Sequence, residues 1–171
     1  MSSSPTFKEL FRDCRRTAVH LEARDAYSKT DSAFVDWKAG KSIDPAERWG
    51  AWHAIVSEAV SRGAEVRRAR IVSTPVSEYI RFEHEVTEGL NIAAGEQVRW
   101  LPRRSASDLL LPGNDFWLFD SRLLYLNHFD GEGEPTEPEI TEISEADAKI
   151  YETAFDAVWN RAIPHTQFEA R

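Results

Sequence analysis

The sequence predicts an α+β or α/β fold, with a helical N-terminal portion packed on a small mixed sheet of four or five strands. Three observations support this prediction. Residues 1–63 carry apolar side chains at helical spacing, the spacing changes to strand-like alternation after Gly63, and an amphipathic helix lies near the C-terminus. The expected parts are therefore a helical portion, 1–63, and an α/β portion with a C-terminal helix, 64–171, joined in one compact unit.

Helix start signals recur through the first part. Thr6 and Glu9 have the spacing of a capping box for a first helix. Asp31 is placed to cap a short helix that ends near residue 40. Asp44 followed by proline is a strong start for a longer helix that stops near residue 63. The first 63 residues are therefore predicted to be mostly helical.

The second part reads as strands with two helices. A strand over 66–72 is followed by a helix near 76–89, and a second strand covers 97–101. Residues 115–120 and 123–129 predict a hairpin, and the acidic stretch 130–141 predicts a loop. Ser144 precedes a last helix that runs to about residue 163. Trp100, Phe116 and Leu118 are expected in the core.

Composition and net charge exclude several classes of protein function. The chain has 171 residues, 42% hydrophobic and 29% charged, which is ordinary for a soluble globular protein. Its formal net charge of −8 makes general attraction to nucleic acid or to anionic membranes unexpected. It has no apolar run long enough to span a membrane, no apolar signal core at its start and one cysteine. A cytoplasmic location is the default expectation, with no membrane association and no cofactor.

Arginines gather in the central segment of this acidic chain. Strand alternation puts Arg68 and Arg70 on one face, and guanidinium groups bind phosphate or carboxylate through paired donors. If Arg70, Arg81 and Arg99 converge on solvent, they should hold an anion. The candidate ligand-binding residues are Arg68, Arg70, Ser73, Ser77, Tyr79, Arg81, Arg99 and Arg103.

Each candidate also has a structural interpretation. The arginines can form ion pairs within the fold, and such networks are common without function. Ser73 and Ser77 can cap the following helix, and Tyr79 can fill the core. Glu22 and Asp25 have the chemistry of general acids or bases, but salt bridges are the more frequent role of such residues. The carboxylates expected to pair with the arginines are Glu78, Glu83, Glu96, Asp115 and Asp120.

Several segments resemble an actinobacterial family of unknown function, whose members are often encoded beside helix-turn-helix regulators. The similar segments are Leu-Glu-Ala-Arg-Asp-Ala-Tyr at 21–27, Ser-Glu-Tyr-Ile-Arg at 77–81, Gly-Glu-Gln-Val-Arg-Trp-Leu-Pro-Arg at 95–103 and Asp-Phe-Trp-Leu-Phe-Asp at 115–120. The resemblance covers nearly the whole chain. It implies a bacterial cytoplasmic protein with a regulatory role and a helix-turn-helix regulator as partner, and it transfers no catalytic residue.

The order of elements also looks like half of a phospholipase-D-like domain, which is an analogy of fold alone. Phospholipase-D-type catalysis needs a histidine two residues before a lysine, and none of the five histidines has that neighbour. Phosphate-loop, dinucleotide-binding and serine-hydrolase motifs are absent, as are histidine pairs with metal-ligand spacing. We therefore expect no catalytic residue and no metal ligand.

Two functions remain as hypotheses. The first is a non-enzymatic regulatory or binding protein that senses a small anionic ligand or docks a transcriptional regulator. The alternative is a hydrolase or transferase that holds a phosphorylated substrate in an arginine clamp. Direct nucleic-acid binding is not expected from the net charge.

Overall fold

The structure, a computed structural model, describes residues 5–28 and 30–171. Seven strands form one sheet in the order β6-β5-β4-β1-β2-β3-β7. The strands are β1 Thr17–Glu22, β2 Glu65–Val72, β3 Gln97–Pro102, β4 Phe116–Phe119, β5 Leu123–Leu126, β6 Glu139–Glu142 and β7 Ile163–Pro164. The α-helices are α1 Phe7–Asp13, α2 Ser32–Lys38, α3 Pro45–Arg48, α4 Gly50–Ser61, α5 Glu78–Thr87 and α6 Glu145–Arg161.

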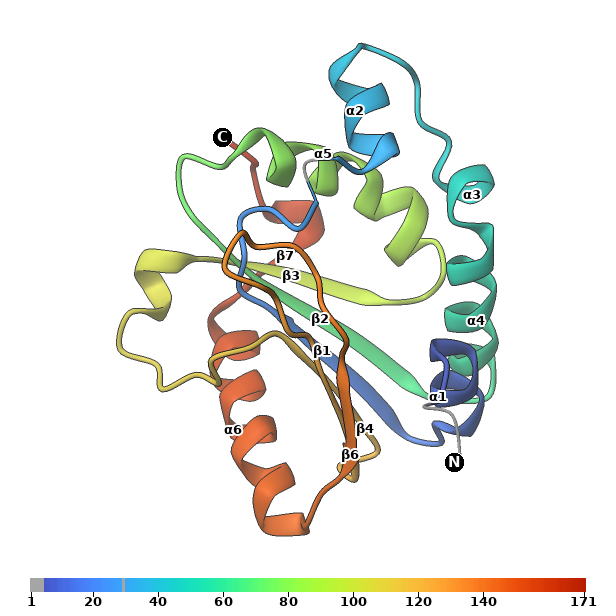
Figure 1. The fold of residues 1–171 in the computed structure, drawn as a ribbon, viewed down its shortest axis with the longest axis vertical. Coiled ribbons are helices and arrows are strands. Elements are labelled where there is room, and N and C mark those ends of the chain that lie inside the picture. Colours follow the sequence, from blue (N-terminus) through green and yellow to red (C-terminus); the bar gives the residue numbers. More distant parts are fainter. Residues whose placement is uncertain (1–4, 29) are drawn as a thin grey trace.

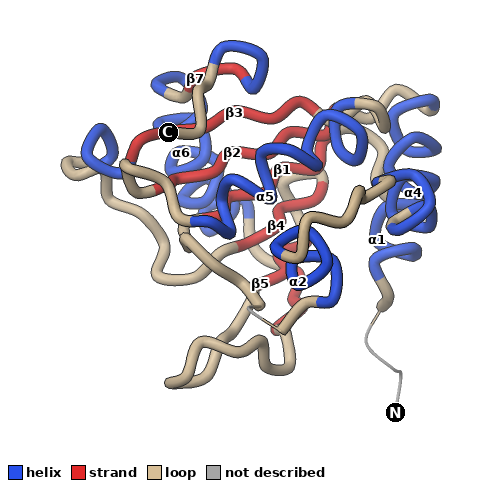
Figure 2. The backbone as a smooth tube through the Cα atoms, turned by 90° about the horizontal axis from the view of Figure 1, so that it is seen from above, coloured by secondary structure: helices blue, strands red, loops and turns tan. Residues whose placement is uncertain are grey.

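The sheet is mixed, with a parallel centre and antiparallel margins. β2 pairs in parallel with both β1 and β3, whereas β4, β5 and β6 continue the sheet as antiparallel neighbours. Helix α6 covers one face, and α1, α4 and α5 cover the other (Figures 1 and 2). Helix α2 stands at one end of the molecule, beyond the main helical layer (Figure 1). The mixed α/β class predicted from the sequence is confirmed.

The capping signals explain where the helices begin. Thr6 and Glu9 form the predicted capping box of α1. The side chains of Asp31 and Asp44 accept hydrogen bonds from the first backbone N–H groups of α2 and α3. Ser144 caps α6 in the same way. These local signals act over three or four residues, so the sequence alone reveals them.

The core is divided by the sheet into two apolar layers. On the α6 side, Phe116 and Leu118 of β4 are 0% and 2% exposed. On the other side, Trp100 of β3 is 0% exposed and packs with residues of the C-terminal segment. The predicted burial of these three residues is confirmed. Among the described residues, no helix is both long enough and apolar enough to cross a membrane.

The sheet is larger than the four or five strands predicted. β1 lies within the part expected to be mostly helical, β6 starts inside the predicted loop at 130–141, and β7 is a two-residue edge strand. β1 was missed because His20 and Glu22 place polar groups where a buried strand normally has apolar ones. Those polar side chains are balanced by partners on β2, which lies more than forty residues away.

Candidate functional site

Four ionisable side chains lie together near the carboxyl ends of β1 and β2, on the sheet face that α4 and α5 cover. His20 and Glu22 come from β1, and Arg68 and Arg70 come from β2. The parallel register pairs His20 with Arg68 and Glu22 with Arg70. Strand alternation therefore places all four on one face, where each is at most 7% exposed.

Glu22 is the centre of this group, because two arginines and a histidine surround its carboxylate. Arg68 Nη1 donates to Oε1, Arg70 Nε donates to Oε2, and His20 Nε2 lies 3.0 Å from Oε1. Burial acts to raise the pKa of Glu22, but the charges of Arg68, Arg70 and His20 outweigh it, so the pKa lies well below its usual value. Glu22 is therefore held as a carboxylate.

Both arginines also reach further groups. Arg68 Nε donates to Glu96 Oε1 at 2.7 Å. Arg70 Nη1 donates to the Thr87 hydroxyl at 2.7 Å, and its Nη2 lies 4.0 Å from Glu83 Oε1. The two guanidinium charges are thus already matched by the carboxylates of Glu22 and Glu96. We call the following residues the buried charge network: His20, Glu22, Arg68, Arg70, Glu83 and Glu96.

Glu83 is the least satisfied member of the buried charge network. Its Oε2 atom is buried and has no hydrogen-bond partner among the described residues. Burial raises the pKa of Glu83 to about 7, with Arg70 opposing the rise and Glu22 adding to it. This carboxyl group therefore changes its charge near neutral pH, whereas Glu22 stays ionised.

Only two of the eight candidate ligand-binding residues, Arg68 and Arg70, belong to this network. Arg99 lies on the opposite face of the sheet, where it donates to the Trp159 carbonyl at 3.1 Å and stacks 4.4 Å from the Trp159 ring centre. Arg81 is exposed on α5. The convergence of Arg70, Arg81 and Arg99 that an anion site there would need is not observed, because alternation along β3 turns Arg99 toward α6.

Arg103 joins the ends of the central strands. Its Nη2 donates to the carbonyls of Ala23 at 2.8 Å and Ile71 at 3.2 Å, and to Asp25 Oδ2 at 3.1 Å. Asp25 in turn accepts from the backbone N–H and the hydroxyl of Ser73, each at 2.7 Å. Ser73 therefore does not cap α5, and Asp25 has the salt-bridged role considered for it.

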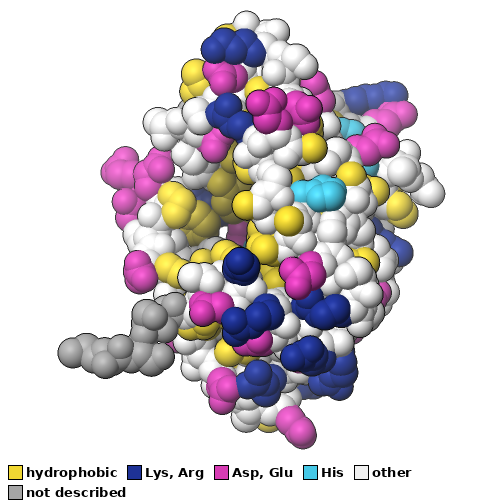
Figure 3. Space-filling model, turned by 90° about the vertical axis from the view of Figure 1, so that its right-hand side faces the viewer, with side chains coloured by type: hydrophobic (Ala, Val, Ile, Leu, Met, Phe, Trp, Pro, Cys, Tyr) yellow, Lys and Arg dark blue, Asp and Glu magenta, His cyan; other side chains and the backbone are white. Residues whose placement is uncertain are grey.

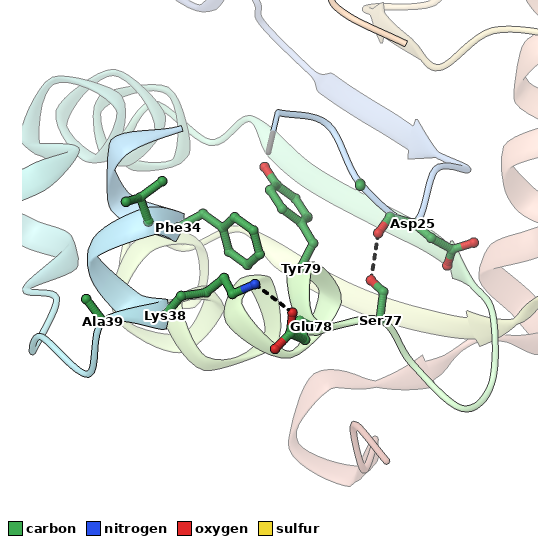
Figure 4. A pocket seen from close by; sticks show the side chains of 9 residues that line it. Asp25, Phe34, Lys38, Ala39, Ser77, Glu78 and Tyr79 are labelled. Atoms are coloured by element: carbon green, nitrogen blue, oxygen red, sulfur yellow. Dashed lines mark hydrogen bonds and ion pairs between the residues drawn. The ribbon is translucent and has the colours of Figure 1, made fainter. Parts of the chain in front are cut away.

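The remaining two candidates, Ser77 and Tyr79, line a pocket of about 710 Å³ between α2 and α5 (Figure 4). We call it the helix pocket. Tyr79 on α5 faces Phe34 on α2, with ring centres 5.0 Å apart. Val35, on the next position of α2, is 50% exposed although it is apolar. The pocket thus has an aromatic wall and accessible apolar surface.

The polar rim of the helix pocket carries one exposed ion pair. Lys38 Nζ lies 2.9 Å from Glu78 Oε2, with about half of each side chain exposed, at 48% and 60% (Figure 4). Ser77 caps α5 by accepting from the Ile80 N–H at 3.1 Å, and its hydroxyl donates to the Asp25 carbonyl at 2.7 Å. The capping role expected for Ser77 is confirmed.

Sequence reasoning missed the α2 side of this pocket. Phe34 and Lys38 lie on one side of a helix that the sequence predicts, and their spacing of four residues is a helical face. No local signal showed that α2 would pack on α5, whose residues are forty or more positions away. The salt-bridged role favoured for Glu22 is observed, but its partners on β2 and the position of His20 beside it were missed for the same reason.

Charges on the face formed by α1 and α4 are mixed. Lysine and arginine side chains gather at its lower end, with acidic side chains between them (Figure 3). Arg12 pairs with Asp13 at 2.8 Å, and Arg62 pairs with Glu58 at 3.3 Å. Across residues 5–28 and 30–171, no group of three or more histidine, cysteine or acidic side chains is arranged to hold a metal ion.

Two solved structures are similar to this chain. Nuc from Salmonella typhimurium, a phospholipase D family member, matches with a TM-score of 0.52 and 10% identity over 92% of this chain and 86% of its own. TrmBL2, an archaeal chromatin protein, matches with a TM-score of 0.49 and 10% identity over 91% of this chain. This chain spans only 47% of TrmBL2. The similarity to Nuc is one of fold, and it confirms the phospholipase-D-like arrangement.

No curated protein matches the sequence. Residues 5–170 match a protein family that is described as a domain of unknown function, DUF6879. The match covers nearly the whole chain, and the chain therefore belongs to the DUF6879 family.

Proposed function

We propose that this protein is a non-enzymatic binding protein that senses a small amphipathic anion in the helix pocket. The observation that carries the proposal is an apolar pocket with one accessible cation, Lys38, at its rim. Ligand pockets are typically concave and mostly apolar, with a few polar groups that fix the orientation of the ligand. An aliphatic or aromatic carboxylate fits this description, with its apolar part packed against the lining side chains of Phe34, Val35 and Tyr79.

The ion pair at the rim can exchange partners at little cost. Exposed pairs such as Lys38–Glu78 contribute only about 0–1 kcal/mol to stability. When a ligand carboxylate replaces Glu78 as the partner of Lys38, little free energy is therefore lost with the internal ion pair. Its apolar part would gain about 25 cal/mol for each Å² of apolar surface that leaves water.

The buried charge network is a poor alternative site for the anion. A ligand bound to Arg68 or Arg70 would have to displace Glu22, and breaking a buried ion pair costs about 3–5 kcal/mol. For this reason the second hypothesis, a hydrolase or transferase with an arginine clamp, has less support. The histidine and lysine pair that phospholipase-D-type catalysis needs is also absent from the sequence.

The regulatory part of the proposal concerns α2. This helix stands at one end of the molecule (Figure 1). It contacts α5 through aromatic side chains, including Phe34 and Phe82. A ligand bound between α2 and α5 would stabilise one position of α2. We propose that a transcriptional regulator of bacterial, cytoplasmic origin contacts α2 and responds to that position.

The proposal can be tested with sodium hexanoate as the probe ligand, followed by tryptophan fluorescence. Trp37 reports on the pocket because its ring lies 6.1 Å from that of Phe34. Hexanoate should bind more tightly than hexanol, and hexylamine should bind most weakly. Lys38→Met should weaken hexanoate binding by about tenfold, as expected for one charge-assisted hydrogen bond. Glu78→Gln should strengthen it, because Lys38 is then free of its internal partner.

Lys41→Met is the matched control. Lys41 is also exposed and paired, to Asp36 at 2.7 Å, but it does not line the helix pocket. Its loss should change hexanoate affinity less than twofold, the size of a weak surface effect. Equal effects of Lys38→Met and Lys41→Met, or no hexanoate binding at all, would contradict the proposal.

A further inference from the structure

A second pocket, which we call the strand-end pocket, lies beside the carboxyl end of β1. Its volume is about 240 Å³, and residues of the loop between β5 and β6 form one of its sides. The side chains that matter for its chemistry are three aromatic rings and two carboxylates: Tyr27, Tyr125, Phe129, Glu22 and Asp115. The imidazoles of His20 and His128 also line the pocket, which thus combines electron-rich rings with acidic and imidazole side chains.

Asp115 is a buried carboxylate without a charged hydrogen-bond partner. It is 4% exposed, and its Oδ1 accepts from the Ala23 N–H at 2.9 Å. Its Oδ2 accepts from the Tyr27 hydroxyl. Both donors are neutral, in contrast to the two arginines that bind Glu22. Burial raises the pKa of Asp115, although the Tyr27 hydrogen bond opposes the rise.

The aromatic wall already receives one cation. The guanidinium carbon of Arg24 lies 3.8 Å from the centre of the Phe129 ring. Arg24 also donates to the Gly133 carbonyl at 3.0 Å, which ties the β5–β6 loop to the segment after β1. Tyr27 and Phe129 are neighbours, with ring centres 6.0 Å apart. Rings arranged in this way attract cations through their electron-rich faces.

From these observations we propose that the strand-end pocket binds a small organic ammonium ion. The ammonium group would provide Asp115 with a countercharge, and its carbon atoms would contact the rings of Tyr125 and Phe129. An anion is disfavoured by the carboxylate of Asp115, which, unlike Glu22, has no arginine partner. Aromatic rings suit a weakly hydrated organic cation better than a hard metal ion, which prefers several oxygen ligands.

The test is calorimetric titration of the full chain with tetramethylammonium chloride, with sodium chloride at the same ionic strength as the reference. Tetramethylammonium should bind and sodium should not. Asp115→Asn should weaken binding about tenfold or more, because the carboxylate charge is lost while the size is kept. Phe129→Leu should weaken it about threefold or more through loss of the ring face.

Glu137→Gln is the matched control for diffuse attraction. Glu137 is exposed on the same loop. Burial raises the pKa of Tyr125, and the nearby charge of Glu137 adds a smaller rise. Its substitution should change the affinity less than twofold, the size of a screened surface effect. Lys38→Met should also leave it unchanged, which separates this site from the helix pocket.

Three results would overturn the proposal. The first is an absence of tetramethylammonium binding to the wild-type chain. The second is an equal loss of affinity in Asp115→Asn and Glu137→Gln, which would show general attraction to an acidic surface. The third applies if Asp115→Asn fails to fold: Phe129→Leu then decides, and unchanged binding in that variant contradicts the pocket.

Discussion

Glu22 and Arg68 form a buried hydrogen bond between the neighbouring parallel strands β1 and β2. Arg68 is paired in register with His20, so its hydrogen bond to Glu22 joins positions that are two residues out of register. The His20 ring meanwhile stacks on Trp117 of β4, with ring centres 4.2 Å apart. The charges of the central strands are therefore balanced within the sheet before any ligand binds.

This relationship predicts a large effect for a single substitution. Glu22→Ala leaves the guanidinium groups of Arg68 and Arg70 buried with their central partner removed. The free energy of unfolding should fall by about 3–5 kcal/mol, as for other broken buried ion pairs. Urea denaturation measures the change. Glu142→Ala, which removes an exposed partner of Arg122, is the control and should cost less than about 1 kcal/mol.

The raised pKa of the buried Glu83 carboxyl group predicts that the stability of the fold depends on pH. Its pKa is about 7 in the folded chain against an ordinary value of 4.5, so folding favours the protonated form. The stability that this group contributes is present below about pH 4.5 and is lost as the pH rises through about 7. Glu83→Gln keeps the shape without the titration, so its urea midpoint should exceed that of the wild type most clearly at pH 8. A constant difference between the two from pH 5 to 8 would show that Glu83 does not titrate in this window.

The lowered pKa of His165 predicts the opposite dependence of stability on pH, in a lower pH range. Burial, with His84 and Arg70 nearby, lowers the pKa of His165 from 6.5 to about 4. Trp100 Nε1 donates to His165 Nδ1 at 3.1 Å, and a proton on that nitrogen removes the acceptor. The stability contributed is therefore present above about pH 6.5 and is lost as the pH falls through about 4.

The consequence should be visible in the C-terminal segment that follows α6. Amide hydrogen exchange there should accelerate between pH 6.5 and 4, after correction for the intrinsic rate. His165→Asn retains an acceptor and removes the titration, so the corrected rates in this variant should not change with pH. Identical pH profiles for both chains would rule out His165 as the cause.

Phe116 tests the packing of the α6 side of the core. The side chain is fully buried and meets Tyr151 of α6 edge to face, with ring centres 4.9 Å apart. Phe116→Ala should lower the free energy of unfolding by about 3–5 kcal/mol. Ile150→Ala is the control, because Ile150 is 62% exposed on the same helix and should contribute little. A wild-type melting temperature for Phe116→Ala would contradict the assignment of β4.

Features with local signals could be predicted from the sequence. Capping residues such as Thr6 and Asp44 mark their helices within four positions. Alternation identified β2, the flanking Gly95 and Pro102 marked β3, and a continuous apolar run marked β4. The pairing of Arg68 with Glu96 was foreseen as one structural alternative and is observed. In each case the evidence lies in residue types at short spacing.

Features that depend on distant partners could not be predicted. β1 carries His20 and Glu22, whose burial makes sense only beside Arg68 and Arg70 on β2. β6 is a short edge strand in an acidic segment, and only its pairing with β5 identifies it. The helix pocket needs α2 to fold back onto α5, and no residue pattern within either helix specifies that contact.

The most direct test of the central claim is the map of backbone amide shifts in ¹⁵N-labelled protein during titration with hexanoate and, separately, with inorganic phosphate. If the helix pocket is the anion site and the arginines are structural, hexanoate should shift the amides of 34–39 and 77–79. Phosphate should shift the amides of β2 and β3 no more than chloride does at the same concentration. Shifts centred on Arg68, Arg70 and their neighbours, with none on α2, would contradict the account.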